Sequence, residues 1–365
     1  MGEASLLRTP LHDRNSALGA KIVPFAGFEM PVQYSGILRE HDAVRSSAGL
    51  FDLSHMGQIE LRGNVGAWAD TLTVNDVASM APGVARYNLF CNDSGGTLDD
   101  VIFYRLADRW YLVVNASNAD KMVTYLQAHL PAGIVLTNYH GRRALIAVQG
   151  PRALEILAPM FGADIGALRY YGVCEAQVRG AQAIVARTGY TGEDGFEIFL
   201  DAADAVPTWD AILERGEASG LLPAGLGARD VLRLEAGMPL YGHELSESIS
   251  PLAAGLQWAI KWNKPHFVGK EALLEERQSD AYRRIVGLIV ASRAPAREGY
   301  AVFAGDRNVG QVRSGAPAPS VGNQNIATAL VEKDASAVGE RLQVEIRGSR
   351  FDAQSVTMPF YRRKK

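Results

Sequence analysis

The sequence contains few cysteines and no long apolar run. Only Cys91 and Cys174 occur among 365 residues, so neither a disulfide framework nor a four-cysteine metal site can form. No apolar run approaches the ~20 residues that a membrane helix requires. The first residues also lack the basic and apolar segments of a secretory signal. We therefore expect a cytoplasmic protein without a membrane span.

The sequence also has little excess charge of either sign. The formal net charge is −3, from 37 basic and 40 acidic residues, which offers no general attraction for nucleic acid. The spacing of His55, His140 and His243 does not suit metal ligation. We predict structural histidines with satisfied hydrogen bonds and no bound metal.

The length and the texture of the chain predict more than one domain. Single hydrophobic cores stop growing at about 250–300 residues. Helical and strand patterns alternate irregularly up to about residue 275, which is typical of an α+β region. Beyond residue 280 short β-type runs follow one another between glycine, proline, asparagine and aspartate. Residues 285–365 are therefore predicted to form an all-β, barrel-like domain, with the boundary inside the charged stretch 275–284.

Hydrophobic periodicity predicts the individual elements. The predicted strands are 58–62, 98–104, 111–115, 144–148 and 183–187, with C-terminal runs at 285–290, 300–303, 309–313, 326–331 and 341–346. The predicted helices are 37–47, 64–72, 118–129, 151–158 and 203–215. Trp258 and Trp262 alternate as in a further strand, which would line a channel or close a domain interface.

A glycine-rich segment, Arg187-Thr188-Gly189-Tyr190-Thr191-Gly192-Glu193-Asp194-Gly195-Phe196-Glu197-Ile198, runs directly into an apolar strand. Glycine lets the backbone adopt positive φ and come close to a ligand, and a rigid strand then projects the side chains that follow. The segment is interpreted either as a binding site or as an ordinary hairpin turn.

Two adjacent carboxylates, Asp99 and Asp100, lie in the predicted strand 98–104. Neighbouring strand residues point to opposite faces, so these two side chains cannot form a dyad with each other. Leu98, Ile102 and Tyr104 share the face of Asp100, and Thr97, Val101 and Phe103 share that of Asp99. The periodicity alone does not choose between the two carboxylates, and both also suit a turn that binds backbone N–H groups.

The motifs together resemble the glycine cleavage T-protein family of tetrahydrofolate-dependent aminomethyltransferases. The matching blocks are Phe25–Val32, Gly49–Gly57, Asn92–Asp100, Val113–Ala116, Arg187–Gly195, Ala224–Asp230, Leu232–Gly237 and Phe267–Leu273. Their order along nearly the whole chain makes the resemblance specific. It implies three domains in a cloverleaf around a central folate channel, with two intertwined α+β domains in residues 1–275 and the barrel as the third domain.

The resemblance also implies the reaction. An aminomethyl group on a dihydrolipoyl arm of the lipoylated H-protein passes its carbon to tetrahydrofolate, a co-substrate. Ammonia is released and 5,10-methylenetetrahydrofolate forms. The family motif places the functional carboxylate at Asp100, which leaves Asp99 as a structural cap. A carboxylate can orient the attacking folate nitrogen, stabilise positive charge on it, or remove its proton.

The family positions name the folate-binding residues. Glu197 suits the N–H donors of the pterin edge, and Arg229 suits the folate glutamate or the ring oxygen. The remaining positions form the wall of an aromatic pocket; they are Tyr87, Tyr190, Tyr361, Met56 and Asn115. Each has a structural alternative: Tyr87 and Met56 as core residues, Arg229 as the partner of Asp230 at a helix start, Tyr361 as a C-terminal anchor.

Two rival functions remain from the same superfamily. A folate-binding accessory protein without aminomethyltransferase activity is expected to carry a Lys-Gly-Cys-Tyr-type motif, which the sequence lacks. A dehydrogenase with a similar C-terminal part is expected to carry a Gly-x-Gly-x-x-Gly segment between a strand and a helix, and the N-terminal region has none.

Overall fold

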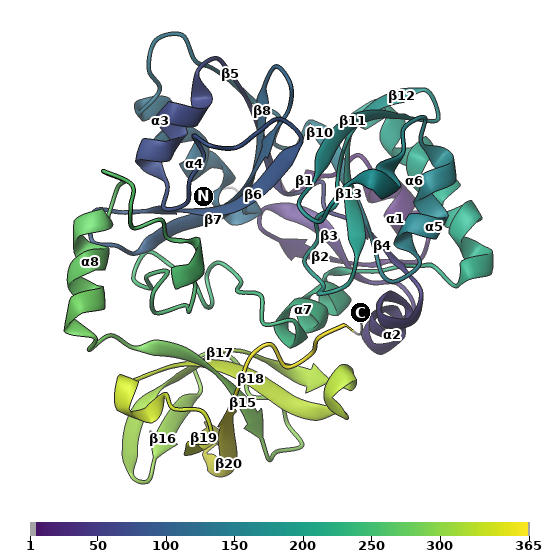
Figure 1. The fold of residues 1–365 in the computed structure, drawn as a ribbon. Coiled ribbons are helices and arrows are strands. Elements are labelled where there is room, and N and C mark those ends of the chain that lie inside the picture. The colour runs from purple at the N-terminus through teal and green to yellow at the C-terminus, as the bar shows by residue number, and fades with distance from the viewer. Residues whose placement is uncertain (1–4, 364–365) are drawn as a thin grey trace. The chain divides into compact units, whose positions relative to one another are not determined.

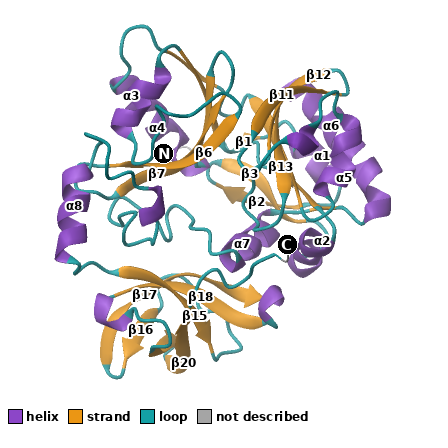
Figure 2. Ribbon diagram, in the orientation of Figure 1, coloured by secondary structure: helices purple, strands orange, loops and turns teal. Residues whose placement is uncertain are grey.

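The computed structural model of the chain describes residues 5–363 (Figure 1). The chain divides into two compact units made of interleaved stretches. The first unit contains the chain up to Trp68, then Val77–Tyr87 and Val101–Asp230. The second contains Ala69–Asp76, Asn88–Asp100 and the chain from Val231 onward. Helices and strands are mixed, as Figure 2 shows, which confirms the predicted α+β class. None of the helices within residues 5–363 is long and apolar enough to cross a membrane.

The first unit contains two complete sheets. Their strands are β1 (Leu7–Arg8), β2 (Lys21–Phe25), β3 (Phe28–Gln33), β4 (Gly49–Asp52), β10 (Arg143–Gln149), β11 (Val173–Val178), β12 (Ala181–Ala186), β13 (Gly195–Asp201) and β14 (Leu222–Pro223). One sheet has the order β1-β3-β2, and the other has the order β11-β12-β13-β10-β4-β14. The helices of this unit are α1 (His12–Ala17), α2 (Ile37–Ser46), α4 (Ala119–Ala128), α5 (Ala153–Leu157) and α6 (Ala202–Gly216). Helix α6 buries Ala205, Trp209 and Ile212 in the core, because their spacing places them on one helical face.

A third sheet has the strands β5 (Gly57–Arg62), β6 (Val84–Cys91), β7 (Thr97–Arg105), β8 (Trp110–Val114) and β9 (Val135–Asn138). Its order is β6-β7-β8-β5-β9. The strands β6 and β7 and helix α3 (Val65–Leu72) each run along the chain from one unit into the other. Asp100 is the last residue of β7 that belongs to the second unit.

The second unit ends in a closed barrel. Helix α7 (Leu226–Glu235) leads into this unit, and helix α8 (Lys270–Ser279) precedes the barrel. The barrel strands are β15 (Arg284–Val290), β16 (Ala301–Ala304), β17 (Arg307–Ala318), β18 (Gln324–Val331), β19 (Arg341–Ile346) and β20 (Ser349–Val356). All neighbours pair antiparallel, and β15 closes the barrel by pairing with both β18 and β20. The barrel-like C-terminal fold predicted from the sequence is thereby confirmed.

Most of the predicted elements agree with the structure within a few residues. The strand predicted around Trp258 is wrong, because residues 257–259 form a 3₁₀ helix after Gly255, whose φ is +74°. Helix α8 occupies the first half of the charged stretch that was expected to be a connection. Several elements were not predicted from the sequence, among them β2, β3, β6, β11, α7 and β20. The 3₁₀ helices are η1 (Ala116–Asn118), η2 (Ala158–Met160), η3 (Ile165–Ala167), η4 (Glu217–Ser219), η5 (Gln257–Ala259), η6 (Pro319–Val321) and η7 (Lys333–Ala335).

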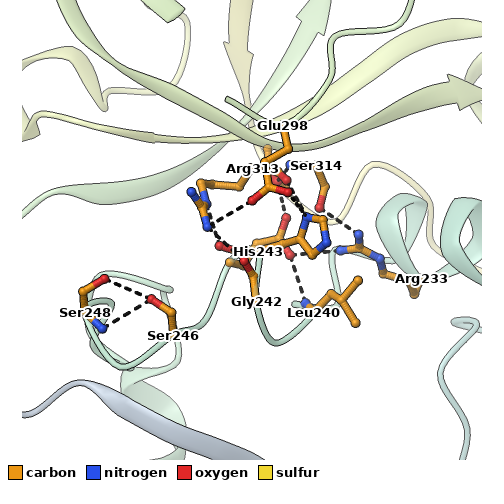
Figure 3. A network of polar contacts seen from close by, with 11 residues as sticks. Arg233, Leu240, Gly242, His243, Ser246, Ser248, Glu298, Arg313 and Ser314 are labelled. Carbon is orange, nitrogen blue, oxygen red and sulfur yellow. Dashed lines mark hydrogen bonds and ion pairs between the residues drawn. The ribbon is translucent and has the colours of Figure 1, made fainter. Parts of the chain in front are cut away.

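A buried ion pair in the second unit joins α7 to the barrel. Arg233 and Glu244 are each only 2% exposed, and their charged groups meet at 3.0 Å. Arg233 also donates to the Ser314 hydroxyl of β17 at 2.7 Å (Figure 3). Glu244 accepts hydrogen bonds from the Thr328 hydroxyl of β18 and from the Leu240 N–H, the latter at 2.9 Å. These additional partners offset the cost of removing two charges from water.

We predict that Glu244→Gln lowers the free energy of unfolding by about 3 kcal/mol at pH 7, because Arg233 is left buried without a counter-charge. Burial alone raises the pKa of Glu244, but the Arg233 guanidinium and the hydrogen bonds reverse this, so the pKa lies below the ordinary 4.5. The stabilisation is therefore complete above the ordinary pKa and disappears as the pH falls through the lower folded-state pKa. The free energies of unfolding of the variant and the wild type should therefore become more similar as the pH falls. Urea unfolding between pH 7 and pH 3 measures both.

The control is Glu155→Gln, which removes half of an exposed ion pair with Arg152 and should change the urea midpoint little. A gap between Glu244→Gln and wild type that stays constant down to pH 3 would contradict the assigned role of the charge.

Candidate functional site

The glycine-rich segment forms the connection between the antiparallel strands β12 and β13 in the first unit. Arg187 and Asp194 close it with two parallel hydrogen bonds of 2.9 and 2.6 Å. The Gln149 side chain of β10 fills the space beside the glycines. A Cβ on Gly189 would lie 1.8 Å from the Gln149 Oε1, and a Cβ on Gly195 would lie 2.5 Å from its Nε2. These two glycines therefore make room for a packed side chain of the protein itself.

Glu193, in the same turn, is used for structure. Its Oε1 accepts from the Arg45 guanidinium at 2.8 Å, and Arg45 also donates to the Thr191 carbonyl at 2.7 Å. The side chains of Arg45 and Glu193 are 9% and 5% exposed. This ion pair ties the turn to helix α2, so the turn is a rigid support for the strand that follows.

Glu197 is held in a different way. It is 8% exposed, and its Oε2 accepts hydrogen bonds from the Tyr104 hydroxyl at 3.1 Å and from the Thr188 hydroxyl. Burial and the Glu197 carboxylate raise the pKa of Tyr104 well above its ordinary value, so Tyr104 remains a donor. Among residues 5–363 neither a cation nor a hydrogen-bond donor is paired with the Glu197 Oε1. The carboxylate is therefore oriented on one side and has acceptor capacity on the other.

Arg229 and Tyr190 also come together in the first unit. The Arg229 guanidinium lies over the Tyr190 ring, 4.6 Å from its centroid. Both side chains are half-buried. A guanidinium can stack on an aromatic ring, and its planar set of donors matches the geometry of a carboxylate.

His55 departs from its predicted role. It is 2% exposed, and its Nδ1 has no hydrogen-bond partner within the described chain. The expectation of a satisfied structural histidine is wrong for this atom, because Phe25 and Phe28 pack edge-on against the ring and offer no strong acceptor. Burial, with Arg229 and His140 nearby, lowers the pKa of His55 to about 3. His55 is therefore neutral at neutral pH.

The other two histidines do make hydrogen bonds. A ring nitrogen of His140 lies 3.2 Å from the His55 carbonyl oxygen, and a ring nitrogen of His243 lies 2.8 Å from the Arg313 carbonyl oxygen. Within residues 5–363 there is no group of three His, Cys, Asp or Glu side chains that could hold a metal ion.

The adjacent carboxylates differ in burial. Asp99 is fully buried, as are Thr97 and Phe103 on the same face of β7. Asp100 is half-buried on the opposite face, with Leu98 and Ile102. The alternation expected from the sequence is thus present, and it separates the two carboxylates as predicted.

The remaining candidate residues lie in both units. Met56, Tyr87 and Asn115 are half-buried in the first unit. Tyr361 belongs to the second unit, where its backbone N–H donates to the Glu235 carbonyl at 2.8 Å. Sequence reasoning did not nominate Thr188, Tyr104 or Gln149 as site residues. Thr188 lies inside the quoted motif, but no pattern in the sequence marks Gln149.

Comparison with known proteins assigns the family. Residues 11–264 match the GCVT N-terminal domain, and residues 283–362 match the glycine cleavage T-protein C-terminal barrel domain. The chain is 46% identical to an aminomethyltransferase of Geobacillus kaustophilus over 364 residues, 99% of this chain and 100% of the relative. It is 43% identical to one of Bacillus subtilis over 362 residues, 98% and 100% of the two chains. The crystal structure of glycine cleavage system aminomethyltransferase T from Bartonella henselae matches with a TM-score of 0.91 at 34% identity, covering 98% of each chain.

An α+β region followed by a closed barrel, matched along nearly its full length by aminomethyltransferases, defines the class as an aminomethyl-transferring enzyme. The chain belongs to the glycine cleavage T-protein family. The alternative of an accessory protein without transferase activity receives no support from these matches.

Neither cysteine has the environment of an activated nucleophile. Cys91 is fully buried, and burial, with a smaller contribution from Glu276, raises the pKa of its thiol. Burial also raises the pKa of the half-buried Cys174. Thiols of raised pKa hold very little thiolate at neutral pH.

We predict that the double variant Cys91→Ala, Cys174→Ala keeps aminomethyl-transfer activity within about threefold of wild type, because no covalent protein intermediate is required. The measurement is ammonia release at saturating substrates, with circular dichroism as the check on folding. Loss of activity in a folded double variant, or an aminomethyl adduct trapped on either sulfur, would show that the carbon passes through the protein.

Proposed function

We propose that the chain transfers the one-carbon unit of an S-aminomethyl-dihydrolipoyl group, carried by a lipoylated H-protein, to tetrahydrofolate. The C–S and C–N bonds of the aminomethyl group break, and two bonds form from its carbon to the folate nitrogens N5 and N10. The two N–H protons lost by the folate end on the lipoyl sulfur and on the departing ammonia. The products are 5,10-methylenetetrahydrofolate, the dithiol and ammonia.

The observation that carries the folate part of the proposal is the state of Glu197. Two hydroxyl donors fix its Oε2, and its Oε1 is left to accept an N–H of the pterin edge. Such orientation before binding reduces the entropy lost when the ligand is held. The stacked pair of Arg229 and Tyr190 supports recognition of a flat ring and of a carboxylate.

Asp100 is proposed to act on the attacking folate nitrogen. A half-buried carboxylate stabilises the positive charge that develops on nitrogen as the new bond to carbon forms, and it orients the N–H toward a proton acceptor. Alternation along β7 supports a common face for Asp100 and Tyr104, the residue that orients Glu197. Met56, Tyr87, Asn115 and Tyr361 are proposed to enclose the folate.

The domain division is part of the same proposal. Residues 1–275 are proposed to form the folate-binding aminomethyltransferase region, and residues 285–365 the barrel domain. The end of the first family match at residue 264 and the start of β15 at Arg284 support this division. A cytoplasmic location, with folate and the lipoyl carrier as partners and without nucleic acid, completes the proposal.

The direct test supplies aminomethyl-loaded H-protein with and without tetrahydrofolate. Folate-dependent ammonia release, with one 5,10-methylenetetrahydrofolate formed for each ammonia, is the expected result. Folate binding without ammonia release would instead favour the accessory-protein alternative.

We predict that Glu197→Gln weakens tetrahydrofolate binding by about 1–3 kcal/mol, because an amide N–H then faces a pterin N–H and both donors stay unpaired. Isothermal calorimetry measures the dissociation constant. Glu193→Gln is the matched control from the same turn. It should lower stability through the loss of the Arg45 ion pair and leave the dissociation constant nearly unchanged. Unchanged affinity in Glu197→Gln would assign the glycine-rich turn a purely structural role.

We predict that Asp100→Asn lowers kcat by about 100-fold or more, because the neutral amide cannot stabilise the developing positive charge. The dissociation constant for tetrahydrofolate should stay close to the wild-type value. Asp99→Asn is the comparison variant, and its effect should fall mainly on the thermal midpoint. Near-normal turnover in Asp100→Asn would remove this carboxylate from the reaction.

A further inference from the structure

The turn that leads into β7 is in close backbone contact with residues 246–249 of the second unit. The Thr97 N–H donates to two carbonyls, those of Ser246 at 2.9 Å and Ile249 at 3.1 Å. The Thr97 hydroxyl donates to the Ile249 carbonyl as well, at 3.0 Å. A Cβ on Gly96 would lie 1.8 Å from the Glu247 carbonyl oxygen. Only glycine at position 96 therefore permits this approach of the two backbones.

Asn92 holds the turn from its other end. Its Nδ2 donates to the Glu247 carbonyl at 3.0 Å. Its Oδ1 accepts from the Gly96 N–H at 2.9 Å and from the Ser94 hydroxyl at 2.8 Å. Four hydrogen bonds and the close approach at Gly96 thus connect the turn 92–97 to residues 246–249.

The same segment is fixed to the barrel just before residue 246. Arg313 of β17 donates from its Nε to the His243 carbonyl at 2.6 Å and from its Nη2 to the Gly242 carbonyl at 3.1 Å (Figure 3). Its own carbonyl oxygen contacts the His243 ring. Glu298 bridges the two side chains, 3.3 Å from Arg313 and 3.4 Å from His243. Glu244 adds the buried ion pair already described.

Packing fixes the segment to the barrel again just after residue 248. Ile249 and Ala253 form a small apolar cluster with Leu330 of β18, and the Ile285 N–H donates to the Ala253 carbonyl at 2.8 Å. Between the two attachments lies a cavity of about 590 Å³, lined by residues of the turn, of the segment and of the barrel. This pocket is open to solvent, so hydrogen bonds connect the turn to the segment where side chains do not fill the space between them.

We propose that residues 242–250 form a brace that holds the start of β7 at a fixed distance from the barrel, with Thr97 as a positioning residue for Asp100. A strand rises ~3.3 Å per residue, so Thr97 lies about 10 Å before Asp100 along β7. Because β7 is stiff over this distance, a displacement of Thr97 also displaces the Asp100 carboxylate. This inference rests on the proposed function through the role of Asp100, and its geometry is independent of that role.

The test compares Thr97→Val with Thr97→Ser. Valine keeps the shape and loses the hydroxyl bond to Ile249, and serine retains that bond. We expect Thr97→Val to lower kcat for ammonia release about five- to tenfold, with the dissociation constant for tetrahydrofolate within about twofold of wild type. Thr97→Ser should restore kcat to near the wild-type value. Gly96→Ala should lower kcat further, because its new methyl group pushes the segment away.

Thr73→Val is the matched control. Thr73 is also fully buried in the second unit, where its hydroxyl donates to the Ala69 carbonyl at 2.9 Å and accepts from the Asn88 Nδ2 at 3.0 Å. This variant should lose comparable stability without the loss in kcat. Equal kcat in Thr97→Val and Thr73→Val would overturn the proposal.

Hydrogen exchange provides a readout that does not require activity. Peptides covering residues 97–105 should exchange faster in Thr97→Val than in wild type or Thr73→Val, with barrel peptides unchanged. Unchanged exchange would overturn the brace even if the enzyme assay behaves as expected. A wild-type enzyme that releases no ammonia would contradict the proposed function, and exchange would then decide on the brace alone.

Discussion

The Arg233–Glu244 ion pair is the constraint on which the rest of the second unit depends. Two charges that are almost fully buried require partners on every side, and the partners come from α7, from the Leu240 backbone and from β17 and β18 of the barrel. The pair thereby fixes where the chain leaves the barrel surface after residue 244. The next residues are those that contact the turn before β7. This desolvated pair, together with the Arg313 hydrogen bonds to residues 242 and 243, thus fixes the path of the segment that is proposed to hold the start of the Asp100 strand.

Two glutamates in one turn show how the surroundings assign different roles to the same side chain. Glu193 is neutralised by Arg45, and the ion pair fastens the turn to α2. Glu197, four residues later, accepts hydrogen bonds from the hydroxyl groups of Tyr104 and Thr188, and it has no cationic partner within residues 5–363. Hydroxyl donors orient a carboxylate and leave most of its negative potential available. The second arrangement suits a ligand with N–H donors, and the first suits a structural anchor.

Much of the fold could be predicted from the sequence, and the misses have physical causes. The barrel runs with alternating valine, isoleucine and leucine, such as 285–290 and 326–331, appear as strands in the structure. Strand β20 carries only Phe351, Ala353 and Val356 as apolar residues, so its hydrophobic signal is weak and barrel closure decides its conformation. Residues 256–262 show the opposite error. Their short apolar alternation resembles a strand, but hydrogen bonds from Leu256 back to Pro251 and from Ala259 to Leu256 curl the chain.

Only some residues of the candidate site could likewise be found from the sequence. Sequence reasoning nominated Glu197 and Arg229, because both fall at positions of the family motifs and because a carboxylate and a guanidinium suit the polar groups of folate. It could not assign Gln149, which occupies the space left by Gly189 and Gly195, since that contact exists only once β10 lies beside β13. The segment was interpreted either as a binding site or as a hairpin turn, and two of its glycines leave room for a side chain of the protein itself. With His55 neutral and both thiols protonated, the chain offers oriented carboxylates as its main reactive groups. The proposed chemistry therefore depends on how rigidly the surrounding backbone holds them.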